Sequence, residues 1–89
     1  MPKALVCINT DRFAAEEVLD ELRACPNVEE AYRVQGAYDV VAKISGETNE
    51  SLLDTVTNYI KTVKTVQTAL TMLIVEPEKP AYEERMLIV

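Results

Sequence analysis

The most informative part of the sequence is VEEAYRVQGAYDVVAKI, residues 28–44. It consists of two runs with strand-like alternation, Val28–Gln35 and Tyr38–Ile44, separated by Gly36, one of only two glycines in 89 residues. A glycine between two such runs is typical of a β-hairpin, because the turn needs backbone angles that other residues adopt poorly. The stretch therefore predicts two antiparallel strands, with Asp39 at the start of the returning strand.

Alternation predicts which side chains of the hairpin share a face of the sheet. In the first strand we expect Val28, Tyr32 and Val34 on one face. The second strand is expected to place four residues on one face: Tyr38, Val40, Ala42 and Ile44. Asp39 and Val41 then lie on the opposite face.

The flanking sequence supplies two more strands and two helices. Lys3–Asn9 is a short apolar run typical of a buried strand, and Thr65–Glu76 is a longer, β-branched one. In the last strand we expect two sets of residues on opposite faces: Val66, Thr68, Leu70 and Met72 on one, and Ala69 and Thr71 on the other. A first helix is predicted by an apolar stripe: Ala15, Val18, Leu19 and Leu22. A second, stronger stripe predicts the other helix: Leu52, Leu53, Val56, Tyr59, Ile60 and Val63.

The ends of both helices also have signals. Thr10 or Asp11 is expected to cap the first helix, and Thr48 or Asn49 the second. Pro26 ends the first helix, because proline pushes the preceding residue out of the helical region.

The resulting order of elements is βαββαβ. Few arrangements are open to it, because connections are short and crossovers right-handed. We predict an α+β, ferredoxin-like sandwich: a four-stranded antiparallel sheet with two helices on one face. Several strands carry apolar residues on both faces, so the uncovered face is expected to pack against a second copy in a dimeric α/β-barrel assembly.

Composition argues against several classes of function. Fifteen acidic and nine basic residues give a net charge of −6, and the basic residues are scattered, which disfavours direct nucleic-acid binding. No apolar run approaches the roughly 20 residues needed to cross a bilayer, so we expect no membrane association. Cys7 and Cys25 have no metal-binding spacing and are expected to be reduced packing residues. These features predict a cytoplasmic protein.

Nothing in the sequence predicts catalysis. It has no histidine, no nucleophile beside a base, no phosphate-binding glycine loop and no metal-ligand cluster. Glu29 and Glu30 are adjacent, but neighbours in a strand point to opposite faces. We expect no enzyme activity, no cofactor and no metal.

The string V-x-E-A-Y-x-V-x-G-x-Y-D, from Val28 to Asp39, and the later TVQTALTMLIVE resemble the effector-binding (RAM) domain of the Lrp/AsnC feast-or-famine regulators. The resemblance covers nearly all of residues 3–76, so we divide the chain into a RAM-like domain, 1–76, and a C-terminal tail, 77–89. Full-length members carry an N-terminal helix-turn-helix domain, whereas this chain starts at the first strand. The resemblance therefore implies an amino-acid-responsive regulatory module without its own DNA reader, which forms homodimers and higher homo-oligomers and joins full-length Lrp/AsnC regulators.

The resemblance also implies a ligand site. Amino acids bind family members in clefts between dimers, near the G-x-Y-D turn, to which Gly36, Tyr38 and Asp39 correspond. The Asp39 carboxylate can pair with an α-ammonium group. Members often have a T-x-T pair in the last strand; Thr71 matches its second position and Ala69 stands at the first. The implied ligand-binding residues are Gly36, Tyr38, Asp39 and Thr71.

Ordinary roles exist for the same residues. Gly36 fits a turn, Tyr38 an interface, and Thr71 any strand, while Asp39 can be an exposed strand residue or an ion-pair partner of Lys43 or Arg33. For the whole chain, the alternatives are a dimeric α/β-barrel enzyme, such as a small monooxygenase or isomerase, and a ligand-free assembly subunit.

The tail ends in four consecutive apolar residues, MLIV, at positions 86–89. Apolar side chains are costly to leave in water, at about 1.5–3 kcal/mol each. We expect this run to dock on its own sheet or on a neighbouring subunit, as an oligomer contact.

Overall fold

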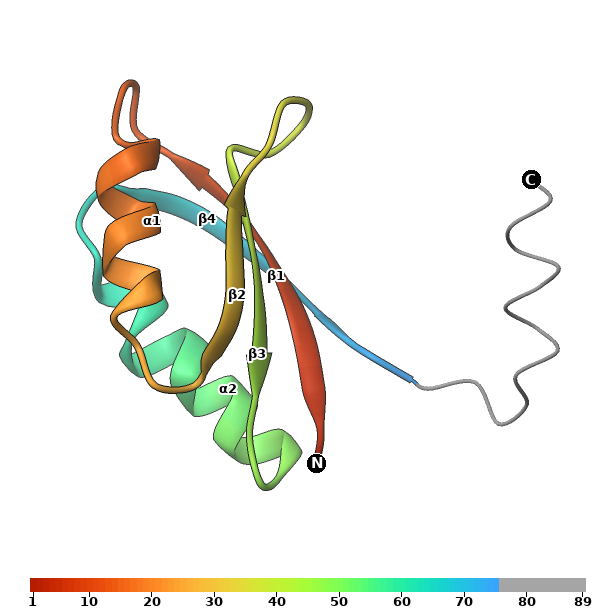
Figure 1. Ribbon diagram of the computed structural model, residues 1–89. Helices are drawn as coiled ribbons and strands as arrows, with labels where there is room; N and C mark the ends of the chain where they lie inside the picture. The colour runs from red at the N-terminus through yellow and green to blue at the C-terminus, as the bar shows by residue number, and fades with distance from the viewer. Residues whose placement is uncertain (76–89) are drawn as a thin grey trace, which may run out of the picture.

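The hairpin strands form one side of a four-stranded antiparallel sheet (Figure 1). A computed structural model describes residues 1–75 of the chain, so the expected docking of residues 86–89 lies outside the described part. In chain order the elements are β1 (Lys3–Thr10), α1 (Ala15–Arg23), β2 (Val28–Arg33), β3 (Val40–Ser45), α2 (Asn49–Asn58), a short 3-10 helix (Ile60–Thr62) and β4 (Val66–Leu73). The strand order is β2-β3-β1-β4, and the predicted ferredoxin-like βαββαβ fold is confirmed.

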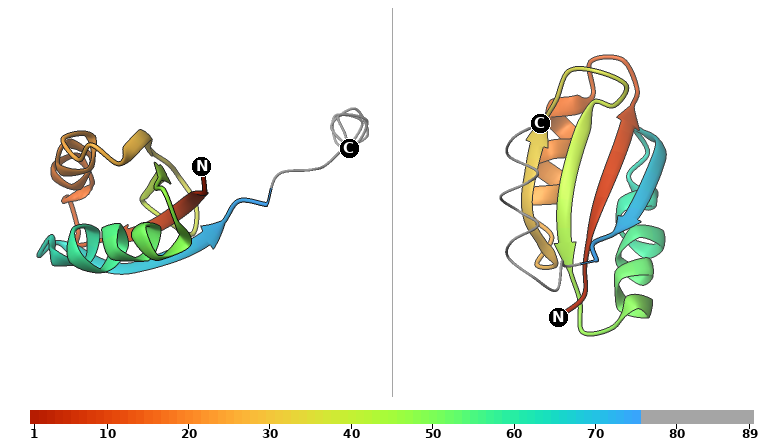
Figure 2. Two further views of the ribbon diagram at one scale, coloured as in Figure 1. Left: turned by 90° about the horizontal axis from the view of Figure 1, so that it is seen from below. Right: turned by 90° about the vertical axis from the view of Figure 1, so that its right-hand side faces the viewer.

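Both helices cover the same face of the sheet, and the core lies between them and the strands (Figures 1 and 2). The buried side chains of the core are Ala4, Val6, Ile8, Val18, Leu19, Leu22, Ala31, Val40, Ala42, Ile44, Leu52, Val56 and Ile60. Most of them stand where the helical stripes and the strand alternation predict. Leu53 is an exception: it is 53% exposed, because it sits beside the stripe centred on Leu52 and Val56.

A β-bulge in β2 changes the predicted faces of the hairpin. Val28 pairs with a core position of β3 and Glu30 with the next position, so Glu29 is an extra residue. Val28 and Tyr32 therefore lie on opposite faces, and Tyr32 is about half exposed. The prediction that they share a face is wrong, because one inserted residue inverts the alternation beyond it.

A second irregularity lies where β4 meets the end of β1. Gln67 has no partner in the register between the two strands. Val66 therefore joins Ala69 against the core and does not share a face with Thr68, contrary to the prediction. The rest of the alternation in β4 is as predicted.

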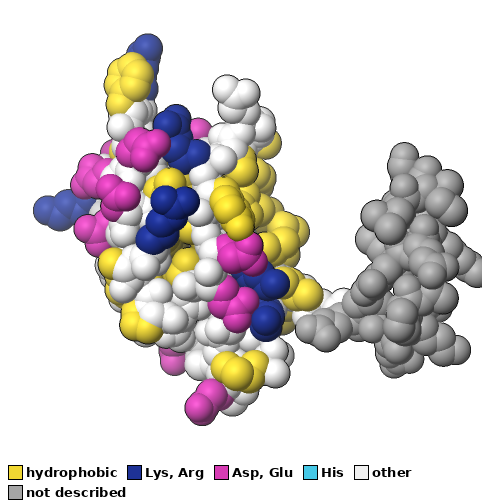
Figure 3. Space-filling view, in the orientation of Figure 1, with side chains coloured by type: hydrophobic (Ala, Val, Ile, Leu, Met, Phe, Trp, Pro, Cys, Tyr) yellow, Lys and Arg dark blue, Asp and Glu magenta, His cyan; other side chains and the backbone are white. Residues whose placement is uncertain are grey.

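The face that the helices leave uncovered carries an apolar row across all four strands. The register aligns Tyr32, Val41, Cys7 and Leu70, one from each strand, and Met72 follows in β4. We call these five residues the open face. Figure 3 shows hydrophobic side chains gathered along the side of the molecule turned away from α1.

The two helices begin differently. Thr48 caps α2 as predicted: its hydroxyl accepts a hydrogen bond from the Ser51 N–H (3.0 Å), and the Ser51 hydroxyl oxygen accepts one from the Thr48 N–H (3.1 Å). Neither Thr10 nor Asp11 caps α1, because residues 11–14 form a separate turn and the helix starts after Ala14 without a side-chain cap. Among the helices described, none is long and apolar enough to cross a membrane.

Candidate functional site

Asp39 lies immediately before β3, against the end of β1. Its Oδ2 accepts hydrogen bonds from the Thr10 N–H (2.8 Å) and the Thr10 hydroxyl (3.4 Å), and its own N–H donates to the Ile8 carbonyl (2.9 Å). It is paired with neither Lys43 nor Arg33, which instead contact glutamates. Within residues 1–75 the other carboxylate oxygen, Oδ1, accepts no hydrogen bond. Asp39 thus anchors the strand with one oxygen and leaves the other available.

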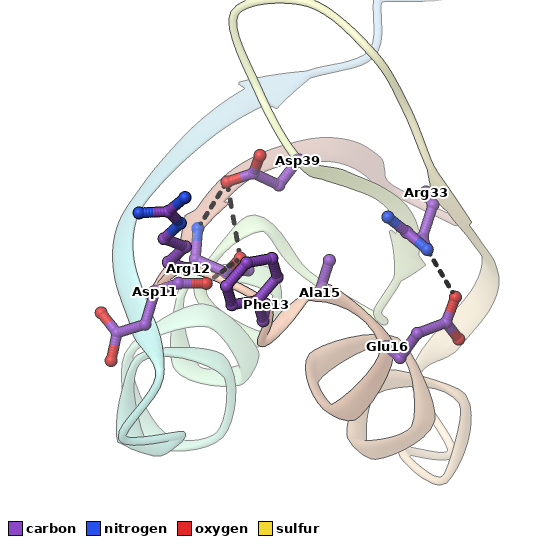
Figure 4. Close-up of a pocket in the computed structure, with 8 residues that line it drawn as sticks. Asp11, Arg12, Phe13, Ala15, Glu16, Arg33 and Asp39 are labelled. Carbon is purple, nitrogen blue, oxygen red and sulfur yellow. Dashed lines mark hydrogen bonds and ion pairs between the residues drawn. The ribbon is translucent and has the colours of Figure 1, made fainter.

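A pocket of about 380 Å³ opens beside this carboxylate (Figure 4). Five segments line it: the end of β1, the turn at residues 11–14, the first turn of α1, the end of β2, and the loop before β3, which contributes Asp39. The lining residues are Thr10, Asp11, Arg12, Phe13, Ala15, Glu16, Arg33 and Asp39. Small-molecule pockets usually span about 300–1,000 Å³, so this one suits a ligand of amino-acid size.

Arg33 and Glu16 connect β2 to the start of α1 across the pocket. Arg33 Nη1 donates to Glu16 Oε1 at 2.8 Å. Their side chains are 57% and 66% exposed, so the ion pair stabilises the fold by at most about 1 kcal/mol. Among the described residues, Nε and Nη2 of Arg33 have no acceptor. The guanidinium therefore keeps donors for a ligand while it holds Glu16.

Phe13, the single phenylalanine of the chain, projects at the rim of the pocket. Its φ of 67° lies in the left-handed region, and its side chain is 91% exposed. The Arg12 guanidinium lies 5.0 Å from its ring centroid. A left-handed backbone costs a residue with a Cβ roughly 1–2 kcal/mol, so Gly or Asn would suit this turn better. Local folding therefore does not account for an aromatic residue here.

Of the four residues implied by the resemblance, the structure brings only Asp39 into the pocket. Gly36 lies in the β2–β3 loop with φ of 146°, which explains the glycine. Tyr38 is half-buried in the same loop. Thr71 pairs with Val6 and so faces the helix-covered side of β4, at the far edge of the sheet from the hairpin.

Arg33, Glu16 and Phe13 were not identified from the sequence. They come from separate segments that no linear spacing brings together, so periodicity gives no signal for the pocket. One signal was present for Phe13: it is an apolar residue just before α1 that falls outside the stripe formed by Ala15, Val18, Leu19 and Leu22.

A second pocket has fewer charged groups that could bind a ligand. It has a volume of about 410 Å³, lies near Asn27 and Gly46 and contains one charged side chain, Glu47. In the described part of the chain no three His, Cys, Asp or Glu side chains are grouped so that they could hold a metal ion. The pocket at Asp39 is therefore the better candidate site.

Comparison with known proteins supports a regulatory role. The family model described as "Lrp/AsnC ligand binding domain" matches residues 3–83. The crystal structure of FFRP-DM1 is 32% identical to this chain, covers 84% of it and 100% of its own length, and has a TM-score of 0.81. A search of curated proteins gave no match.

Two longer regulators share the fold. Escherichia coli AsnC is 20% identical, with coverage of 88% of this chain and 53% of that one and a TM-score of 0.81. A Neisseria meningitidis transcriptional regulator, solved as a complex with L-Met, is 16% identical, with coverage of 88% and 52% and a TM-score of 0.77. The present chain spans about half the length of these two proteins.

Proposed function

Because the chain belongs to the Lrp/AsnC ligand-binding-domain family, we propose that it binds an amino-acid effector and works as a homo-oligomer. Membership of this family makes it an effector-binding regulatory module. We further propose that its partners are other copies of itself and full-length regulators with the same fold.

The position of Asp39 carries the proposal for an amino acid. Its side chain lines a pocket of amino-acid size, and a carboxylate is a natural partner for an α-ammonium group. The N. meningitidis regulator, which has the same fold, was solved with an amino acid, L-Met. Gly36, Tyr38 and Thr71 lie outside the pocket of a single chain, so we propose that they contact an effector only where neighbouring subunits meet.

The open face supports the homo-oligomer. Leu70 is 47% exposed and Tyr32 is also about half exposed, although both lie on the broad face of a sheet. Covering this face with a second copy would remove apolar surface from water, and each Å² buried contributes about 25 cal/mol. Two sheets packed face to face are therefore the favoured pairing.

The same face argues against a dimeric α/β-barrel enzyme. In such a dimer, Val41, Cys7 and Leu70 would line the interior and would supply neither a carboxylate nor an ammonium group. Lys43 and Glu30 lie on the same face, in the row that contains Leu5 and Met72, and they are paired with each other at 4.0 Å. We therefore propose a binding module without enzyme activity.

The first prediction concerns ligand binding. In a thermal-shift screen of the twenty amino acids, we expect at least one to raise the melting temperature. A ligand at 100 times its Kd stabilises a protein by about 2.7 kcal/mol. Asp39→Asn should abolish most of this shift, because the amide removes the charge while its oxygen can still accept from the Thr10 N–H.

The matched control is Asp54→Asn, which removes an exposed carboxylate from α2 and should leave the shift unchanged. If no amino acid shifts the wild-type protein at millimolar concentration, the proposed effector class is wrong. If Asp54→Asn reduces the shift as much as Asp39→Asn does, the reduction comes from the change in the protein's net charge, and the binding site is elsewhere.

A further inference from the structure

β4 forms one edge of the sheet (Figure 2), and within residues 1–75 no strand pairs with its outer side. The Ile74 N–H donates to the Lys3 carbonyl at 2.9 Å, and in an antiparallel pair such hydrogen-bonded positions recur at every second residue. Ala69, Thr71 and Leu73 occupy the positions between them, so their backbone N–H and C=O groups point away from β1. The outer edge of β4 is therefore a row of donors and acceptors that can pair with another strand.

The sequence of β4 is typical of an interior strand. Val66–Leu73 contains no charged residue and no proline, although edge strands normally carry such residues, which prevent pairing with other chains. β2, at the opposite edge of the sheet, has Glu29, Glu30 and Arg33. Within the described residues 1–75, none of the eight residues of β4 is buried. β4 therefore lies at an edge without the protection that β2 has.

Apolar side chains near this edge are exposed on both faces of the sheet. Leu70 and Met72 are 47% and 45% exposed on the open face, and Leu73 is 49% exposed on the face that the helices cover. A second sheet packed on the open face would cover Leu70 and Met72 but not Leu73. A strand beside β4 would bury part of all three side chains, because neighbouring strands are in contact on both faces.

We propose that residues 81–89 of the same chain, AYEERMLIV, pair antiparallel with the outer edge of β4 as a fifth strand. The structure describes the chain as far as Val75, just beyond the end of β4, so the segment starts close to this edge. Residues 76–80 are left for the reversal, which matches the usual hairpin loop of about 2–5 residues. Pro77 and Pro80 both fall in this connection, so every residue of 81–89 can donate a backbone N–H.

The composition of residues 81–89 is that of an edge strand. The segment is about as long as β4, and it has the charged residues that β4 lacks: Glu83, Glu84 and Arg85. In an antiparallel pair its apolar run, 86–89, would lie beside the first half of β4, which includes Leu70. The match to the family model ends at residue 83, so most of this strand would be an addition to the domain that the family shares.

The test is amide hydrogen exchange of the full chain, followed residue by residue by NMR. The N–H groups of Ala69, Thr71 and Leu73 should exchange at least tenfold more slowly in the wild type than in the double variant Leu87→Asp/Ile88→Asp. Adjacent strand residues point to opposite faces, so this variant places a charge on each face of the added strand. The N–H groups of β4 that point toward β1, at Leu70 and Met72, should be equally protected in both proteins and show that the sheet is intact.

Lys79→Glu is the matched control, because it makes the net charge more negative by the same amount but lies in the connection. It should leave all of these exchange rates unchanged. Both variants should also keep the wild-type mass in light scattering coupled to size-exclusion chromatography, since the added strand belongs to the same chain.

Three outcomes would overturn the proposal. If the outward N–H groups of the wild type exchange as fast as unprotected amides, nothing pairs with the edge. If they are protected equally in the wild type and the double variant, another strand, such as β4 of a second copy, covers the edge. If the double variant loses protection together with mass, residues 81–89 dock on a neighbouring subunit. None of these results depends on amino-acid binding, so the proposed function is tested separately.

Discussion

At the scale of single residues, Asp39 serves the fold and the site with different atoms. Oδ2 satisfies the Thr10 N–H at the end of β1, and Oδ1 is free beside the pocket. Asp39→Ala would remove both carboxylate oxygens at once and would leave the Thr10 N–H without its hydrogen-bond acceptor. Asp39→Asn is for this reason the more informative substitution.

Gly36 is needed for its backbone conformation. Gly36 has φ of 146°, and no atom lies within 4 Å of the position that a Cβ would take. We predict that Gly36→Ala lowers the free energy of unfolding by about 1–3 kcal/mol from backbone strain alone. Urea denaturation measures this. Gln35→Ala, at an exposed neighbour, should change it by less than about 0.5 kcal/mol; equal effects of the two substitutions would exclude strain as the cause.

How far the sequence reveals the site depends on the residue. Gly36 and Asp39 lie within one short motif, so the turn and its carboxylate could be predicted. Arg33 and Glu16 could not, because the pocket exists only after β1, β2 and α1 have come together, and the only signal for Phe13 is its position outside the apolar stripe of α1. The unusual backbone of Phe13 leaves no trace in the sequence, since phenylalanine is a residue that this conformation disfavours.

At the scale of elements, hydrophobic periodicity predicted the order and type of both helices and all four strands. It failed for Val28 and Val66, each next to a bulge. A bulge is a feature of two paired strands, and the residues that form it are ordinary strand residues. Alternation within one strand therefore predicts a face only as far as the next bulge.

The start of α2 allows a test of coupling between neighbours. A Cβ on Gly46 would lie 2.3 Å from Ser51 Oγ, an atom of the capping box, and its next contacts, with Leu52, are at 3.4 Å. Gly46→Ala and Ser51→Ala should each lower the free energy of unfolding by about 1–2 kcal/mol. The double variant should cost at least about 0.5 kcal/mol less than their sum, because the clash then has no partner. Urea denaturation of all four proteins checks this, and strict additivity would contradict it.

At the scale of the whole molecule, the open face is an apolar surface that neither helix of residues 1–75 covers. Apolar residues on both faces of the strands predicted it, and the register aligns them into one row that includes Tyr32, displaced there by the bulge in β2. The sequence could not show this row, because its members lie far apart along the chain.

The corresponding prediction is that Leu70→Lys dissociates the oligomer, since a buried ammonium group without a partner is strongly unfavourable in an interface. Light scattering coupled to size-exclusion chromatography should give a smaller mass than for the wild type. Leu53→Lys is the matched control: Leu53 is 53% exposed and Leu70 is 47% exposed, but Leu53 lies on α2. A wild-type mass retained by Leu70→Lys would place the interface elsewhere.

The central position of β1 has a consequence for how this protein is made. Of the four strands, β1 is synthesised before both of its neighbours, β3 and β4: Ala4 pairs with Ile44 on one side and Leu73 on the other. Until the last strand emerges, one edge of β1 has nothing to pair with. The pairing of β1 with β4 joins the two ends of the sheet in sequence, and such non-local pairing makes folding slower than that of a helical domain of similar length.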